Sequence, residues 1–224
     1  MQGRQKEEVQ AFRRALKFLD DHAGELHPPS LGPCRKRLAG HVKAIDDAAA
    51  GEIRSRAAQL GLTEAKHEIR GILRNRMGIV VALAAHTEGL EDLVSFTVPH
   101  IRTNDEMLIA AARALASAAA PFVQVIARQV GSLDPVGQIT KGADDLEACV
   151  EAYGKHRIAH REYSETIPVE IAKARVQRNV LTATVRLEAN NTGRRDLMVA
   201  WRAAISVHGK PGPKRKRGRR PKGR

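Results

Sequence analysis

The chain has 224 residues, 42% hydrophobic but only 3% aromatic, so Ala, Leu, Val and Ile must build its core. That composition favours helices packed on helices over a sheet sandwich, and the length suffices for one well-buried domain. The formal net charge of +13 is uneven, because residues 209–224 hold nine Lys and Arg residues and no acidic residue, which leaves +4 for residues 1–208.

Several protein classes are disfavoured. Cys34 and Cys149 lie far apart without a CxxC motif, which argues against a disulfide scaffold or a structural zinc site, so we expect both to be reduced core thiols. The longest unbroken apolar run, residues 77–85, is far shorter than the roughly 20 residues that span a bilayer. The first ten residues lack the apolar segment of a signal peptide. We therefore expect a cytoplasmic protein that does not enter a membrane.

Apolar residues at helical spacing predict three helices in the first part of the chain. The first covers residues 5–26, and His27-Pro28-Pro29 ends it. The second runs from Gly32-Pro33 to Gly61, and the third begins after Thr63. We expect them to bury these side chains: Val9, Phe12, Leu16, Leu19 and Leu26; Leu38, Val42, Ile45, Ile53 and Leu60; and Ile69, Leu73, Met77, Val80 and Leu83.

Three cations, Lys66, Arg70 and Arg74, step by four along the opposite face of the third helix. Residues four apart lie above one another on a helix, so the three form one row. Such a row could contact phosphates, but a solvated helix face is the commoner situation and is our interpretation.

A connector at residues 88–102 contains a predicted short helical turn, and a fourth helix follows at residues 103–130. Thr103 and Glu106 form a capping box, Pro121 predicts a kink, and Gly131 ends the helix. This helix is apolar nearly all round, which is typical of the middle of a bundle.

The fifth predicted helix begins at Asp134-Pro135 and fades between residues 161 and 164. The sixth begins near Pro168, and a last short helix covers residues 195–207, with Trp201 as a cap over the end of the core. In the sixth we expect the inner face to be filled by Val176, Val180, Leu181, Thr184 and Leu187.

Short links between long helices predict an all-α antiparallel bundle of about six long helices and one short helix over residues 1–208. The stretch from the third helix through residues 197–207 resembles a set of bacterial all-helical proteins without an assigned activity. That resemblance implies only a bundle fold.

The predicted bundle offers weak signals for metals or catalysis. His156 and His160 have metal-ligand spacing but no carboxylate or thiolate in register, and Glu64-x-x-His67 is half of a di-metal motif. Two Arg-x5-His pairs resemble the Arg-x(4–6)-His motif of HEPN ribonucleases, in which both residues serve RNA cleavage. We expect no metal, no cofactor and no enzyme activity, although a HEPN-like ribonuclease stays an alternative on the pairs Arg35/His41 and Arg202/His208.

Residues 209–224 read GKPGPKRKRGRRPKGR, and Gly and Pro at this density predict a disordered tail. The tail resembles an AT-hook, whose Arg-Gly-Arg-Pro core lies in the narrow A·T minor groove. It departs from that core because Arg219 and Arg220 both precede Pro221. The predicted nucleic-acid-binding residues are Lys214, Arg215, Lys216, Arg217, Gly218, Arg219, Arg220, Pro221, Lys222 and Arg224.

The sequence thus predicts a nucleic-acid-binding protein that acts through its tail on DNA, either nonspecifically or with an A·T bias. RNA is the alternative nucleic acid. The competing hypothesis is a protein-interaction bundle, able to self-associate, whose tail only keeps it soluble.

Overall fold

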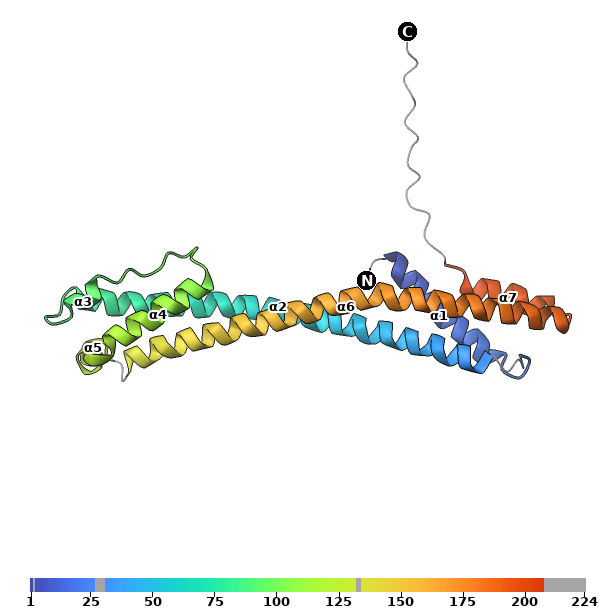
Figure 1. Cartoon of the computed structure of the whole chain (residues 1–224), viewed down its shortest axis with the longest axis horizontal. Coiled ribbons are helices and arrows are strands. Elements are labelled where there is room, and N and C mark those ends of the chain that lie inside the picture. The colour runs from blue at the N-terminus through green and yellow to red at the C-terminus, as the bar shows by residue number, and fades with distance from the viewer. Residues whose placement is uncertain (2, 27–30, 132–133, 208–224) are drawn as a thin grey trace, which may run out of the picture. The chain divides into compact units, whose positions relative to one another are not determined.

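The computed structural model describes residues 1, 3–26, 31–131 and 134–207, and within these ranges every regular element is a helix (Figure 1). The predicted all-α fold is therefore confirmed. In chain order the elements are α1 (Gly3–Asp21), α2 (Leu31–Ala84), α3 (Glu91–Val94), α4 (Asp105–Ala119), the 3-10 turn η1 (Ala120–Phe122), α5 (Val123–Val130), α6 (Pro135–Asn191) and α7 (Arg195–Ile205).

The chain divides into two compact units. Unit 1 comprises residues 1–52 and 161–224, and unit 2 comprises residues 53–160. The divisions fall inside α2 and α6, so each of these helices contributes to the hydrophobic core of both units.

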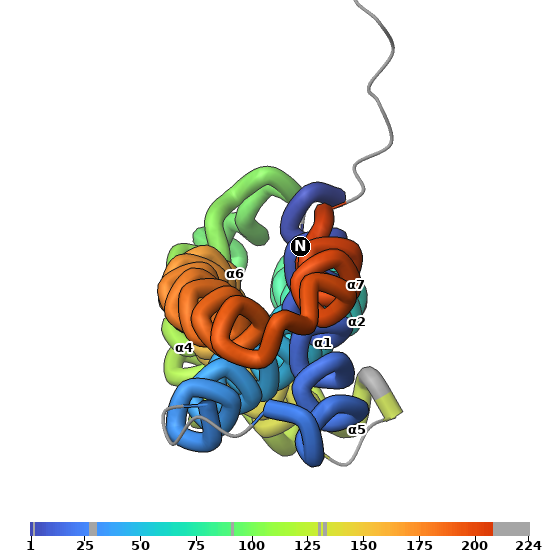
Figure 2. The backbone as a smooth tube through the Cα atoms, turned by 90° about the vertical axis from the view of Figure 1, so that its right-hand side faces the viewer, coloured from blue at the N-terminus to red at the C-terminus, as the bar shows by residue number. Residues whose placement is uncertain are grey.

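Unit 1 packs α1, the first part of α2, the last part of α6, and α7, with α1 and α7 side by side (Figure 2). Its core contains Phe12, Leu38 and Leu181, as their apolar spacing predicts. Trp201 is fully buried within this core, where its ring and that of Phe18 form a T-shaped pair, so the predicted role of a cap at the end of the core is wrong.

Unit 2 packs the second part of α2 and the first part of α6 with α3, α4 and α5. Its core includes Leu73 and Met77 from α2, Leu108 and Leu115 from α4, and Ile139 from α6. These residues follow the predicted stripes. Unit 2 holds the site described below.

Two predicted helix breaks are wrong, because α2 and α6 each run uninterrupted. At Gly61 the backbone stays helical, since a helical glycine costs only about 1 kcal/mol. Nearby, the Gln59 amide donates to the His156 carbonyl of α6 and so supports this stretch of α2. At Pro168 one backbone donor is lost, but Ile167 and Ile171 on either side are buried and keep α6 in register.

The fourth predicted helix starts two residues late and is interrupted. Its N-cap is Asn104, whose Oδ1 accepts from the Met107 amide at 2.8 Å, so the predicted Thr103 capping box is wrong. At Pro121, where a kink was predicted, the helix tightens into η1 before α5 continues. Gly131 ends α5 in the left-handed conformation, as expected.

Part of the predicted core is on the surface. On α2, Ile53 and Leu60 are exposed although the same stripe is buried at Leu38, Val42 and Ile45. On α6 the core is made by Ile167, Ile171, Ala174, Leu181 and Val185, whereas Val176, Val180 and Leu187 are exposed.

The segment Asp105–Gln129 has the length and apolar composition of a membrane span, with a mean hydropathy of 1.6 in its most apolar window, which the run-length argument missed. About a third of that window, 33%, is buried in the structure. The core helix of a soluble protein passes the same test, so this similarity is weak evidence. The placement of α4 in the middle of the bundle is wrong, because Met107 and Ala110 lie on an exposed face.

Candidate functional site

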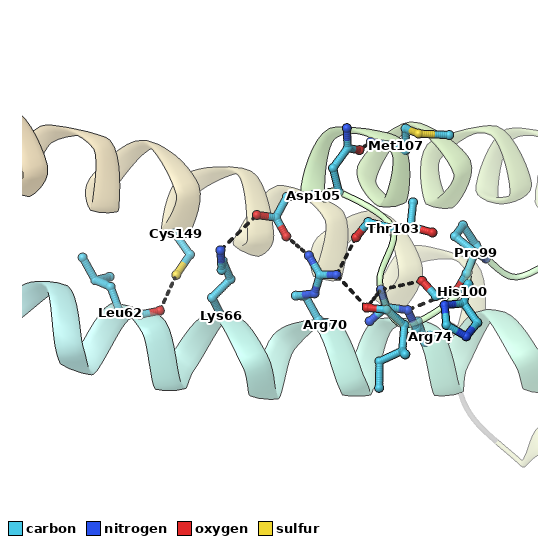
Figure 3. A network of polar contacts seen from close by, with 12 residues as sticks. Leu62, Lys66, Arg70, Arg74, Pro99, His100, Thr103, Asp105, Met107 and Cys149 are labelled. Carbon is cyan, nitrogen blue, oxygen red and sulfur yellow. Dashed lines mark hydrogen bonds and ion pairs between the residues drawn. The ribbon is translucent and has the colours of Figure 1, made fainter.

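The candidate site is built on the row Lys66, Arg70 and Arg74 of α2, which we call the basic row (Figure 3). The spacing of four places the three side chains on one helix face. That face is directed at residues 99–105, which end the connector between α3 and α4 and begin α4. The row is therefore half-buried, and its interpretation as a solvated face is wrong.

A single carboxylate, Asp105 at the start of α4, joins two members of the row. Its Oδ2 accepts from Lys66 Nζ at 3.1 Å, and its Oδ1 accepts from Arg70 Nη1. An acidic residue in the first turn is also favoured by the helix dipole. Asp105 thus fixes the N-terminus of α4 on the face of α2.

Backbone carbonyls of the connector occupy the other donors of the two arginines. Arg70 Nη2 donates to the carbonyls of Thr103 at 2.6 Å and Ile101 at 3.1 Å. Arg74 donates through Nε to Pro99 at 3.2 Å and through Nη2 to His100 and Ile101, each at 3.1 Å. A connector without regular hydrogen bonding is in this way satisfied by two side chains of α2.

Positive charge is crowded in this site. Burial and the neighbouring Arg70 charge lower the pKa of Arg74. Burial by itself would raise the pKa of Asp105, but its hydrogen bonds with Lys66 and Arg70 outweigh burial and lower it. Asp105 therefore stays ionised, and the three cations exceed it by two charges.

The site continues toward α6. Lys66 Nζ lies 5.8 Å from the centre of the Tyr153 ring, within the range of a cation–π contact. Cys149 donates through Sγ to the Leu62 carbonyl at 3.4 Å, and burial raises the pKa of this thiol. Cys34 and Cys149 are both buried and free, as predicted.

The residues predicted to bind nucleic acid, Lys214 to Lys222 and Arg224, lie outside the described residues. His156 and His160 lie together on α6, and Glu64 and His67 on α2. Throughout the described ranges there is no cluster of three or more His, Cys, Asp or Glu residues able to hold a metal ion.

The two HEPN-like pairs differ in what the structure places around them. Arg35 Nε donates to Asp20 at 2.6 Å, while His41 Nδ1 lies 2.7 Å from Glu170, so the members of the first pair contact different acids. In the second pair Arg202 lies on α7, and His208 is outside the described residues.

Sequence reasoning found the basic row but did not predict that it binds the connector and the start of α4. The only local signal was Asn104-Asp105, a polar pair that follows a connector and precedes an apolar helix. Which cations that carboxylate meets depends on the packing of α4 against α2, which spacing alone does not give.

Comparison with known protein families, curated proteins and solved structures found no match for this chain.

Proposed function

We propose that this protein binds nucleic acid, preferentially DNA, through the cationic tail at residues 209–224. The observation that carries the proposal is the distribution of charge: nine cations and no acid lie in the tail, whereas the rest of the chain has a net charge of +4. A dense cationic segment releases counterions from the phosphate backbone, and this release drives sequence-tolerant binding.

The bundle supports this assignment because many of its cations are already neutralised. In the described residues, arginines of unit 1 and unit 2 are ion-paired with carboxylates within their own unit, which reduces their attraction for a polyanion. The pairs are Arg13–Asp46, Arg35–Asp20, Arg113–Asp144, Arg175–Glu8 and Arg194–Glu25.

The test compares two full-length variants that lose the same charge. In the tail variant Gln replaces Lys214, Arg215, Lys216, Arg217 and Arg219. If about five tail side chains meet phosphates, the wild-type plot of log K against log salt falls with a slope of about −4 to −5. We expect the tail variant to flatten this slope and to weaken duplex DNA binding about 100-fold near 50 mM salt.

In the matched body variant, Gln replaces five exposed cations that form no ion pair within the described residues: Lys17, Lys36, Arg37, Lys43 and Arg56. We expect this variant to keep most of the wild-type slope. Equal losses in both variants would assign the binding to overall charge and overturn the proposal. Fluorescence anisotropy over a salt series, with duplex DNA and duplex RNA in parallel, measures both slopes and the preferred nucleic acid.

An A·T bias is a separate property of the same tail. If Gly218 to Pro221 enters the minor groove, Arg219→Ala should remove the preference for A·T-rich duplexes and keep much of the salt slope. Equal affinity of the wild type for A·T-rich and G·C-rich duplexes would leave only the nonspecific mode.

Self-association of the bundle is a second proposed function, favoured by the outer face of α6 in unit 1. Val169, Val176, Val180 and Leu187 are 52%, 58%, 42% and 60% exposed. Their spacings of seven, four and seven are symmetric about residue 178, over about 27 Å of helix. An antiparallel second copy would place Val169 opposite Leu187 and Val176 opposite Val180, as a two-fold interface requires.

Charge does not oppose this pairing. Among the cations between Val169 and Leu187, only Lys173 lies on the same helix face as these four apolar residues. It bonds Glu170 of its own helix at 2.6 Å. A dimer would also present two tails to one nucleic acid, and linked binding segments raise the overall affinity through effective concentration. In this proposal, self-association of the bundle raises the affinity of the tail for nucleic acid.

We expect Val176→Asp to convert a dimer into a monomer, because it places an unpaired carboxylate at the centre of the apolar contact. Sedimentation velocity measures the change, with helicity as the control for folding. Val199→Asp on α7, where Val199 is 66% exposed away from the stripe, should remain dimeric. A wild-type protein that sediments as a monomer at tens of micromolar would refute the interface.

A further inference from the structure

A recess lies beside the basic row in unit 2, with a volume of about 380 Å³. It is bounded by α2, the connector and α6. The lining residues that matter here are Lys66, His67, Arg70, Arg74, Ile101 and Tyr153. Its volume falls within the range of small-molecule sites, roughly 300–1,000 Å³.

The lining of the recess carries uncompensated positive charge. Among the described residues that line it there is no carboxylate, and Asp105, just outside, is shared by Lys66 and Arg70. Arg74 has carbonyl partners but no carboxylate partner in the described part of the chain, and its Nη1 makes no hydrogen bond there. The local charge is therefore close to +2 before a ligand binds.

The recess also has an apolar side. Ile101 is 70% exposed and lines it together with Tyr153, whose ring is near Lys66. An apolar and aromatic surface next to cations suits an organic anion better than a bare inorganic ion, because the carbon part of the ligand then gains burial as well as charge pairing.

We propose that this recess binds the phosphate monoester of a small organic molecule. A phosphate monoester carries about −1.5 to −2 charges at pH 7, which matches the local excess. Lys66 Nζ and Arg74 Nη1 donate to the phosphate oxygens, and His67 stands at the rim as a further donor. The organic part lies against Ile101 and Tyr153.

The experiment titrates full-length protein with 5′-AMP by calorimetry at pH 7 and low salt, with adenosine and inorganic phosphate as reference ligands. We expect one AMP per chain, with adenosine and inorganic phosphate each at least about tenfold weaker. Arg74→Gln should weaken AMP binding about tenfold or more, the effect of losing one charge-assisted hydrogen bond.

Because Arg74 also holds the connector, a second variant blocks the recess without touching those bonds. Gly71 lines the recess, and a Cβ added there meets no atom within 4 Å, so Gly71→Leu fills the space on a helix that tolerates it. Gly61→Leu on the same helix, also with open space and away from the recess, is the matched control. We expect Gly71→Leu to abolish AMP binding and Gly61→Leu to change it less than about twofold.

The tail must be separated from the recess, because it too attracts phosphates. AMP binding should persist in the tail variant described above. Absence of AMP binding, its loss in the tail variant, or its survival in Gly71→Leu would each overturn the proposal. Adenosine or inorganic phosphate binding as tightly as AMP would overturn the assignment to an organic phosphate. None of these outcomes depends on nucleic-acid binding.

Discussion

Replacing Trp201 by Ala is expected to destabilise unit 1 by about 3–5 kcal/mol, the range for removing a large aromatic side chain from a core. Trp201 is fully buried, and its ring centroid lies 5.3 Å from that of Phe18 in an edge-on arrangement. Its indole N–H donates to Thr182 Oγ1 at 3.1 Å. The side chain thus joins α7 to α1 and α6, and its removal leaves a cavity among three helices.

Urea unfolding followed by circular dichroism measures the loss, since the tryptophan probe itself is removed. Trp201→Phe keeps most of the apolar volume and should cost about half as much. Val199→Ala, an exposed position on the same helix, should stay within about 0.5 kcal/mol of wild type. If Trp201→Ala cost no more than Val199→Ala, α7 would not be part of the core of unit 1.

The contacts around α7 explain why one residue has such influence. The C-terminal end of α7 is also held by Arg14 of α1, which donates through Nε to the Ala204 carbonyl at 3.1 Å and through Nη2 to the Ser206 carbonyl at 2.5 Å. These exposed bonds contribute little compared with the buried ring.

The helices of this chain could be predicted from apolar spacing wherever one stripe faces one core. In α1, Val9, Phe12 and Leu19 are buried as expected, and α7 has almost the predicted bounds. Helix ends were predictable where backbone geometry decides them, as at Gly131, which needs a positive φ of 67°. These predictions succeeded because side-chain periodicity and the backbone conformation of single residues determine such features.

The continuation of α2 through Gly61 and of α6 through Pro168 was not predictable in the same way. Both residues are unfavourable in helices, but the penalty is a few kcal/mol at most and tertiary packing decides whether a helix continues. The buried neighbours Ile167 and Ile171, and the bond between Gln59 and α6, supply that packing. A single sequence shows that Gly and Pro disfavour a helix, but it does not show the tertiary contacts that offset this cost.

The second apolar stripe on α6 shows a further limit. Val176 and Leu187 were expected in the core as members of one apolar series with Val180, Leu181 and Thr184. The structure buries the neighbouring stripe of Ile171, Leu181 and Val185 instead. When a helix carries two apolar stripes, the sequence does not show which stripe packs into the core of its own chain. The stripe that stays exposed is the one for which we propose contact with a second copy of the protein.

Replacing Asp105 by Asn is expected to destabilise unit 2 by about 2–3 kcal/mol at pH 7. Removing one partner of a buried ion pair costs about 3–5 kcal/mol, and this site is partly solvated, with side chains 13% to 27% exposed. The loss arises because Lys66, Arg70 and Arg74 would remain crowded without their carboxylate. The matched control is Asp46→Asn, which removes the exposed pair with Arg13 and should cost less than about 1 kcal/mol.

The pH dependence separates this ion pair from a packing effect. The folded-state pKa of Asp105 is lowered, so its stabilisation is fully present above the unfolded-state pKa, about 3.9, and is lost as pH falls through the folded value. In urea melts, the difference between wild type and Asp105→Asn should therefore be constant from about pH 7 to pH 5 and shrink below that. Faster amide hydrogen exchange at the start of α4 in the variant would locate the loss, because Asp105 holds that end of the helix on α2. A difference independent of pH down to the acid transition would show that the carboxylate acts there without its charge, and the electrostatic account of the basic row would be wrong.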